Sequence, residues 1–349
     1  MGKVKVNVFT MAYNAQATLG RAIESILNQT FRDLEYYILD NGSDDQTWDI
    51  MLRYAKSDKR IVPLNVSKND PTNGWAIFRT IINVTNADYI MWCDADDAYT
   101  LDFLRNMVRF SEEYSLDIAA GGYDMINGNT GKIEKHKVLE NNLIVYGSRF
   151  KDEFINYRGF ISYLWGKLYS SSFLKSADYA RPPGKARTCN DTIWTLNMFQ
   201  KADRIGIYGK AMYKYYQYHN SLSHRNIEDG LSSYRDLWTA TKEYLEYYGP
   251  VSKLNEDFLY AIYLSLVDEA VGNIFAGEMD TEKKLGLLEK VFNDPVWTDT
   301  LKRDADPMFR NLAVRQEFVY GIKDKILSLS EIEKYAAQKQ CLFSYLGIL

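Results

Sequence analysis

YIMWCDADDAY, residues 89–99, places three aspartates within four positions, directly after a run of large apolar residues. The apolar run is typical of a buried strand, and the aspartates follow where that strand should end. Neighbouring carboxylates repel one another, and a buried carboxylate without a partner is unfavourable. The stretch therefore predicts a strand-end site at which Asp94, Asp96 and Asp97 meet a positively charged ligand.

The sequence around this stretch alternates between strand and helix patterns. Strands are expected at residues 4–9, 34–40, 60–67 and 88–94, and helices at residues 15–31, 44–58 and 75–85. This order predicts an α/β fold in which helices flank both faces of a mainly parallel sheet. Ligands of such sheets bind beyond the carboxyl ends of the strands, where residues 10–14, 40–45 and 93–97 are expected to meet.

The pattern changes further along the chain. Residues 115–225 are mixed, with strands expected at 117–127, 141–147 and 204–219 and a helix at 191–201. Helical periods follow at 230–249, 255–275 and 308–329. We therefore expect one domain at residues 1–225, divided at about residue 114 into two halves, and a C-terminal α-helical domain at residues 226–349.

Composition limits the function classes. The 349-residue chain has a net charge of −4 and no basic tract, which gives no reason to expect nucleic-acid binding. The N-terminus lacks a signal-peptide pattern, and no run approaches the roughly 18 apolar residues of a membrane span. Three widely spaced cysteines favour a reducing compartment. These features predict a cytoplasmic protein, with peripheral association at the inner face of the membrane left open.

The aspartate cluster by itself leaves several interpretations open. Carboxylate oxygens are the ligands that Mg²⁺ and Mn²⁺ prefer. A calcium loop would need an oxygen ligand and a glycine where Ala98 and Tyr99 stand. A phosphatase with an Asp-x-Asp nucleophile would want Thr or Val at position 98, and a solvated acidic turn would need no ligand.

Six motifs, in order, resemble those of family 2 glycosyltransferases of the GT-A fold. They are FTMAYN (9–14), AIESILNQTFRDLEYYILDNGSDDQT (22–47), ADYIMWCDADD (87–97), WGKLYSSSFL (165–174), NDTIWTLNMF (190–199) and YYQYHNSLS (215–223). The resemblance covers about residues 4–225. It implies a Rossmann-like GT-A sheet and an inverting transfer of sugar from a nucleotide-diphosphate donor, most often a UDP-sugar.

The resemblance also implies roles for the aspartate stretch. Asp96 would bind Mn²⁺ or Mg²⁺ on the donor diphosphate, and Asp94 would contact the metal or the ribose hydroxyls. Ala95 would lie beside the nucleotide sugar, and Asp97 would orient the other carboxylates. His219 matches a position that carries metal-binding or cationic side chains, although a plain loop histidine is the alternative.

Other matched positions would hold the nucleotide. Asp40 would accept a hydrogen bond from the base, and its alternative role is to cap the turn that follows. Ala12, Tyr13 and Asn14 would pack on the base, whereas Asn14 could instead cap the first helix. Arg79 could reach the phosphates, although a solvated helix face is equally compatible with the sequence.

Asp191 matches the general base of inverting members. A positioned carboxylate can take the proton of an acceptor hydroxyl as that hydroxyl attacks, and the alternative is a helix cap. Asn190 stands where the family usually has Glu. Trp165 and Lys167 would line the acceptor side, and Trp165 could equally be a core residue.

The sequence thus predicts a metal-dependent glycosyltransferase that acts on a glycan, polymer or lipid-linked acceptor in bacterial cell-surface polysaccharide synthesis. The alternative is a catalytically inactive nucleotide-sugar-binding scaffold of the same fold. A pyrophosphorylase would need a glycine-rich basic loop after the first strand, which residues 10–20 lack. Aromatic stripes in the helical domain could be core packing or a surface for a partner or for a homo-oligomer.

Overall fold

The computed structural model describes residues 4–177, 189–218, 230–276 and 279–300. The chain divides into two compact units, each of which is described by itself. The first comprises Met1–Pro183 and Asp191–Ser221, and the second comprises Gly184–Asn190 and Leu222–Leu349. The expected domain boundary near residue 226 and the expected helix at 308–329 lie outside the described residues.

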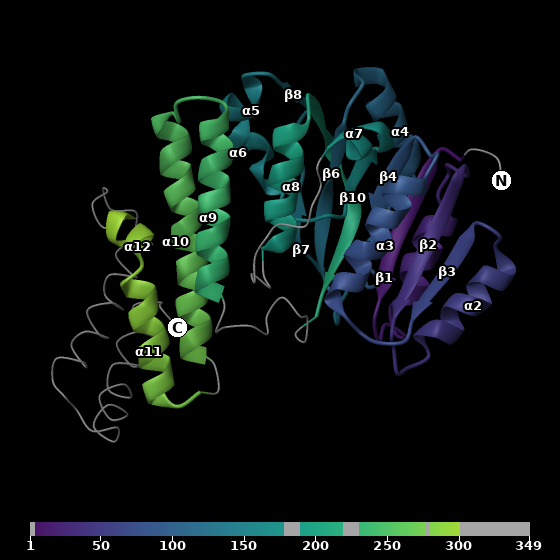
Figure 1. The fold of residues 1–349 in the computed structure, drawn as a ribbon, viewed down its shortest axis with the longest axis horizontal. Coiled ribbons are helices and arrows are strands. Elements are labelled where there is room, and N and C mark those ends of the chain that lie inside the picture. Colours follow the sequence, from purple (N-terminus) through teal and green to yellow (C-terminus); the bar gives the residue numbers. More distant parts are fainter. Residues whose placement is uncertain (1–3, 178–188, 219–229, 277–278, 301–349) are drawn as a thin grey trace. The chain divides into compact units, whose positions relative to one another are not determined.

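A ten-stranded sheet forms the centre of the first unit (Figure 1). Its strands are β1 (Val6–Ala12), β2 (Leu34–Asn41), β3 (Ile61–Val66), β4 (Tyr89–Trp92), β5 (Ala98–Tyr99), β6 (Ile118–Asn127), β7 (Ile133–Lys137), β8 (Leu143–Tyr146), β9 (Lys167–Ser170) and β10 (Arg204–Gln217). The order across the sheet is β3-β2-β1-β4-β9-β6-β10-β5, with β7 beside β6 and β8 beside β10.

Strand direction separates two parts of this sheet. The first four strands, β3, β2, β1 and β4, run parallel. Beyond them β9 runs antiparallel to both β4 and β6, whereas β10 runs parallel to β6. The sheet is therefore mixed, and the prediction of an α/β fold with a mostly parallel sheet is confirmed.

Helices cover both faces of the sheet. Those of the first unit are α1 (Leu19–Leu27), α2 (Thr47–Ser57), α3 (Pro71–Val84), α4 (Phe103–Tyr114), α5 (Arg149–Asp152), α6 (Phe154–Tyr157), the 3₁₀ turn η1 (Arg158–Phe160), α7 (Ser171–Ser176) and α8 (Asn190–Lys201). Val8 of β1 belongs to the core that includes α1 and α4. The next residue, Phe9, instead packs on Phe78 of α3, because successive strand side chains point to opposite faces.

Two expectations about helices need correction. Residues 15–18 precede α1 and residues 28–31 follow it, because the backbone leaves the helical conformation at Thr18 (φ −122°) and the helix ends at Leu27. The sequence analysis also missed α4, whose buried face includes Phe103, Met107 and Phe110. The signal was present in the sequence, because the apolar residues of this segment recur at helical spacing and form one buried face.

The described part of the second unit is helical. It contains α9 (Gly230–Tyr247), α10 (Lys253–Ala276), α11 (Thr281–Phe292) and α12 (Pro295–Thr300). Tyr263 and Trp297 are fully buried in this unit, and the Tyr263 hydroxyl donates to Asp294 Oδ1 (2.8 Å). Among the described helices of the chain, none is both long enough and apolar enough to cross a membrane.

Candidate active site

The carboxyl ends of β1, β2 and β4 meet at one edge of the sheet. Ala12 pairs with Asp40 in register, and Phe9 pairs with Trp92. Thr10 Oγ1 donates to the Cys93 carbonyl (2.7 Å), which fixes the path of the chain as it leaves β4. Parallel register therefore brings together the strand ends that the sequence analysis singled out.

The loop after β1 is tied to the loop after β2. Asn14 adopts the left-handed region (φ 47°), its N–H donates to Ser43 Oγ (3.0 Å), and its Oδ1 accepts from Asp44 N–H (2.9 Å). The suggestion that Asn14 caps α1 is wrong, because Thr18 occupies that position. Tyr13 is 44% exposed and Ala12 is fully buried. The Tyr13 ring is therefore accessible to a ligand, whereas the Ala12 side chain is not.

Asp40 is almost completely buried at the end of β2. Its Oδ1 accepts from Ser43 N–H (3.1 Å), and its Oδ2 accepts from Asn65 Nδ2 (3.1 Å) on β3. The turn-capping bond suggested by the sequence is thus present. Each carboxylate oxygen has a second lone pair, so the cap and a contact with a base are compatible. The role of Asn65 was not predicted from the sequence.

The aspartate cluster follows β4. Oxygen atoms of Asp94, Asp96 and Asp97 lie within 4.8 Å of one another. Asp97 is buried and faces β10, where its oxygens accept from the Tyr213 hydroxyl (2.7 Å) and from Tyr216 N–H (2.8 Å). Asp94 Oδ1 accepts from Trp92 Nε1 (2.6 Å). The bonds of Asp97 leave Asp94 and Asp96 as the carboxylates that are available to a ligand.

Electrostatics at the cluster favour a cation. Burial, together with the charges of Asp96 and Asp191, raises the pKa of Asp94 to about 8. Burial also raises the pKa of Asp96 and that of Asp97. Oxygen donors at this spacing suit a hard divalent ion, and within the described ranges no other group of His, Cys, Asp and Glu is close enough to hold one. The residues present therefore fit Mg²⁺ or Mn²⁺.

Arg21 of α1 reaches this cluster, which the sequence analysis did not predict. Its Nη2 donates to the Asp96 carbonyl and to the Tyr218 hydroxyl (3.1 Å), and its guanidinium carbon lies 3.7 Å from the centre of the Tyr216 ring. The helical period around Arg21 only marks a polar position next to the apolar face of α1. No local signal shows that this polar position faces a strand end.

Asp191 is the second residue of α8, a helix that is anchored by buried side chains. Trp194 is fully buried and lies 5.4 Å, ring to ring, from Trp75 of α3. Thr192 Oγ1 donates to the Ser162 carbonyl (2.9 Å). Asp191 is exposed, yet desolvation by the surrounding protein raises the pKa of its carboxyl to about 6. Asn190, the preceding residue, is half-buried.

Lys167 is the charged neighbour of Asp191. It is 2% exposed, and its ammonium donates to the Tyr163 carbonyl. Burial lowers the pKa of Lys167 to about 7, while the Asp191 carboxylate raises it. In return the Lys167 ammonium lowers the pKa of Asp191. The charge of Asp191 also raises the pKa of Asp94. The carboxylate predicted to act on the acceptor and the carboxylate predicted to bind the donor therefore lie close enough for their charges to interact.

The remaining predicted positions make no described hydrogen bond or ion pair with the aspartates. Trp165 is buried between the stacked rings of Tyr163 (4.1 Å) and Tyr213 (4.2 Å), which agrees with its interpretation as a core residue. Arg79 is exposed on α3, next to the buried Phe78. Ala95 is partly buried. His219 lies outside the described residues.

Comparison with known families agrees with this geometry. Residues 7–172 match the sequence model of glycosyl transferase family 2. Residues 7–172 of the chain belong to glycosyltransferase family 2. The matched range contains the strand ends and all three aspartates of the cluster, and it ends before α8.

Curated relatives of this family member are distant in sequence. Glycosyltransferase GlyA of Streptococcus pneumoniae serotype 4 is 21% identical over 93% of the chain and 45% of its own length. The poly(ribitol-phosphate) beta-glucosyltransferase of Bacillus spizizenii is 25% identical over 68% of the chain and 37% of its own length. The family 2 chain thus matches less than half the length of each of these two relatives.

Solved structures support the fold of this family 2 protein. The S. aureus TarS 1-349 structure in complex with UDP superposes with a TM-score of 0.61 at 17% identity, covering 89% of this chain and 91% of that chain. A second TarS 1-349 structure contains UDP-GlcNAc and gives a TM-score of 0.59. At this identity the likeness establishes the fold alone, and it confirms the expected GT-A-type architecture.

Proposed function

We propose that this protein is an inverting, metal-dependent glycosyltransferase that moves a sugar from a UDP-sugar to a hydroxyl of a glycan, polymer or lipid-linked acceptor. The observation that carries the proposal is the cluster of Asp94 and Asp96 at the carboxyl edge of a parallel sheet, in one electrostatic neighbourhood with Asp191. A divalent ion held there would, when bound, neutralise charge on the departing diphosphate.

The donor side of the proposal rests on the strand ends. The base would stack near Tyr13 and donate a hydrogen bond to Asp40, which is held by Ser43 and Asn65. Asp94 and Asp96 would hold the ion on the diphosphate, and the bonds that Asp97 makes to β10 would keep both carboxylates in place. The UDP and UDP-GlcNAc in the TarS structures support uracil as the first base to test.

The transfer step needs one proton acceptor. The oxygen of the acceptor hydroxyl forms a bond to the anomeric carbon, the bond from that carbon to the diphosphate oxygen breaks, and the diphosphate leaves with its electron pair. The hydroxyl proton goes to the Asp191 carboxylate, which the Lys167 ammonium favours in its ionised form. Attack opposite the leaving group inverts the anomeric configuration.

The acceptor class follows from the relatives. The name of the Bacillus relative specifies a polymer, poly(ribitol phosphate), as the molecule that receives glucose. We therefore propose a role in bacterial cell-surface polysaccharide synthesis on the cytoplasmic side, with peripheral contact with the membrane where the acceptor is lipid-linked.

A nucleotide panel tests this proposal. The protein is melted with UDP, GDP, CDP or dTDP, each with Mn²⁺ or with EDTA. UDP with Mn²⁺ is expected to raise the melting temperature most, because this pair is the proposed ligand. A ligand at 100 times its Kd adds about 2.7 kcal/mol of stability. The Asp96→Asn variant should lose the part of the shift that depends on Mn²⁺ and keep the melting temperature of the free protein.

Two outcomes would contradict the proposal in different ways. The absence of a shift with every nucleotide would remove the donor site altogether. A shift with UDP and Mn²⁺, but no release of UDP from any UDP-sugar with or without polyol and glycan acceptors, would favour the inactive scaffold of the same fold.

A further inference from the structure

The turn that carries the aspartates is fastened to the end of β10 from two sides. On one side the Asp97 carboxylate accepts from the Tyr213 hydroxyl and from Tyr216 N–H. On the other side Arg21 donates from Nη2 to the Asp96 carbonyl and to the Tyr218 hydroxyl. Three segments that are far apart in the sequence therefore meet at this turn.

The ring of Tyr216 adds a third contact to Arg21. The guanidinium carbon lies 3.7 Å from the ring centre, within the distance of a cation–π interaction. A planar guanidinium can stack on an aromatic face and donate in its own plane at the same time, which an ammonium cannot do. The arrangement of Tyr216, Tyr218 and the Asp96 carbonyl therefore suits arginine in particular.

We propose that Arg21 is a positioning residue for the candidate metal site, holding the Asp96 carbonyl so that the carboxylates of Asp94 and Asp96 stay together on the ligand side of the turn. This inference rests on the proposed function of the cluster. Neighbouring carboxylates repel one another and would otherwise open the turn. Arg21 opposes that opening through a backbone bond, and it places a positive charge behind the turn.

If Arg21 only stabilised the fold, its replacement would lower folding stability and leave metal affinity unchanged. Arg21 Nε is buried and has no hydrogen-bond partner among the described residues. An unpaired buried donor is destabilising, so replacing the guanidinium by the apolar Met side chain relieves one unfavourable term while it removes the bonds. We therefore expect Arg21→Met to change folding stability little and metal affinity strongly.

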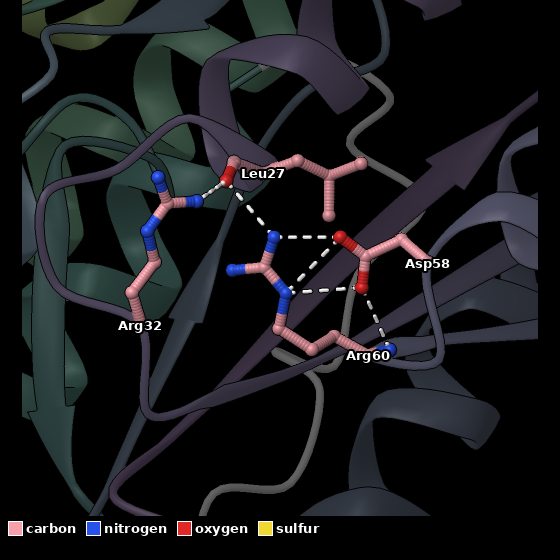
Figure 2. Close-up of polar contacts among 4 residues, drawn as sticks. All are labelled: Leu27, Arg32, Asp58 and Arg60. Atoms are coloured by element: carbon pink, nitrogen blue, oxygen red, sulfur yellow. Dashed lines mark hydrogen bonds and ion pairs between the residues drawn. The ribbon is translucent and has the colours of Figure 1, made fainter.

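Arg60 offers a matched control at the other end of α1. Like Arg21, it is part-buried, donates to a backbone carbonyl, and has one buried nitrogen without a partner in the described structure. In Figure 2 the Nη2 of Arg60 donates to the Leu27 carbonyl (2.9 Å), and its guanidinium pairs with the Asp58 carboxylate (2.7 Å from Nη2 to Oδ2). Arg32 also donates to the Leu27 carbonyl (2.6 Å). None of these contacts involves the aspartate cluster.

The experiment measures Mn²⁺ binding directly, by the electron paramagnetic resonance signal of free Mn²⁺, with saturating UDP. Arg21→Met is expected to raise the Kd for Mn²⁺ at least about tenfold, the usual effect of losing a charge-assisted hydrogen bond. Its melting temperature should stay within about 3 °C of the parent. Arg21→Lys should give an intermediate Kd because it keeps the charge and loses the stacked fork. Arg60→Met should leave the Kd unchanged and lower the melting temperature, because this substitution also breaks the ion pair with Asp58.

Each outcome decides a different point. If the parent protein binds no Mn²⁺ with UDP, the proposed function of the cluster fails. If the parent binds Mn²⁺ and Arg21→Met binds it within twofold of the parent, Arg21 is not a positioning residue. If Arg21→Met does not fold, Arg21→Lys decides: a folded variant with weakened Mn²⁺ binding supports the inference, and one with parental binding overturns it.

Discussion

Asp191 and Lys167 set each other's protonation at the scale of single residues. Desolvation acts in opposite directions on the two groups, since it raises the pKa of the carboxyl and lowers the pKa of the ammonium. Their mutual attraction acts against desolvation in both cases. The balance leaves Asp191 with a pKa of about 6 and Lys167 with a pKa of about 7, close to the pH at which a general base works.

This balance predicts the pH dependence of transfer. A general base acts only when it is unprotonated, so kcat/KM should fall as the pH drops through about 6, the pKa of Asp191. Lys167→Met removes the charge that lowers this pKa, so the acidic limb should move to higher pH. Asp191→Asn should abolish the limb and reduce the rate by about 10² or more.

Rate profiles of the three proteins check this prediction, and UDP binding serves as the control for an intact donor site. A limb that stays in place in Lys167→Met would contradict the coupling between the two residues. A near-parental rate in Asp191→Asn would assign the base to another residue.

At the scale of elements, the turn after β2 is shaped by close contact with the loop that precedes α3. Gly42 has a φ of +73°, and a Cβ there would lie 2.6 Å from the backbone nitrogen of Asn69. Asn41 Nδ2 donates to Asn69 Oδ1 (3.0 Å), and Asn73 Nδ2 donates to Asn41 Oδ1 (2.8 Å). The turn that positions Asp40 therefore depends on a glycine and on an amide that both donates and accepts.

Gly42→Ala should destabilise the protein by at least about 3 kcal/mol, because it combines a strained φ with a backbone clash. Gly131 offers the matched control, since its φ is +71° and nothing lies within 4 Å of a Cβ there. Gly131→Ala should cost about 1–2 kcal/mol from the left-handed conformation alone. Denaturant unfolding of both variants checks the difference, and equal losses would show that the contact with Asn69 is not tight.

Sequence patterns predicted the elements of the parallel part more fully than those of the rest. The helix and strand periods located β1 to β4 and α1 to α3 because each has a clear apolar face over seven or more residues or a bounded apolar run. The two-residue β5 and the four-residue β9 carry too few positions to show a period. Their place in the sheet comes from pairing with distant strands.

At the scale of the whole molecule, the chain holds two compact units, each with its own buried aromatic residues. The core of the first unit surrounds the sheet and includes Phe9 and Phe103. The second unit buries Tyr263 and Trp297 among its helices. Units with separate cores need not unfold in one step.

Calorimetry of the intact chain should therefore show two unfolding transitions. UDP with Mn²⁺ should raise the transition of the first unit, which contains the aspartate cluster. Trp297→Ala, which removes a fully buried ring from the second unit, should lower the other transition by the equivalent of about 3–5 kcal/mol. A single transition that both the ligand and the substitution move would contradict this independence.

The sequence by itself determined the alternation of strands and helices, the strand ends that carry Asp40 and Asp94, and the family. These features are local, because a period, a turn or a motif is complete within a few dozen residues. Only the tertiary structure decided that Arg21 meets Asp96 across 75 positions and Tyr218 across 197, or that Asp97 bonds to Tyr213. Such contacts depend on how elements pack, since a polar position on a helix looks the same in the sequence whether it faces water or a buried carbonyl.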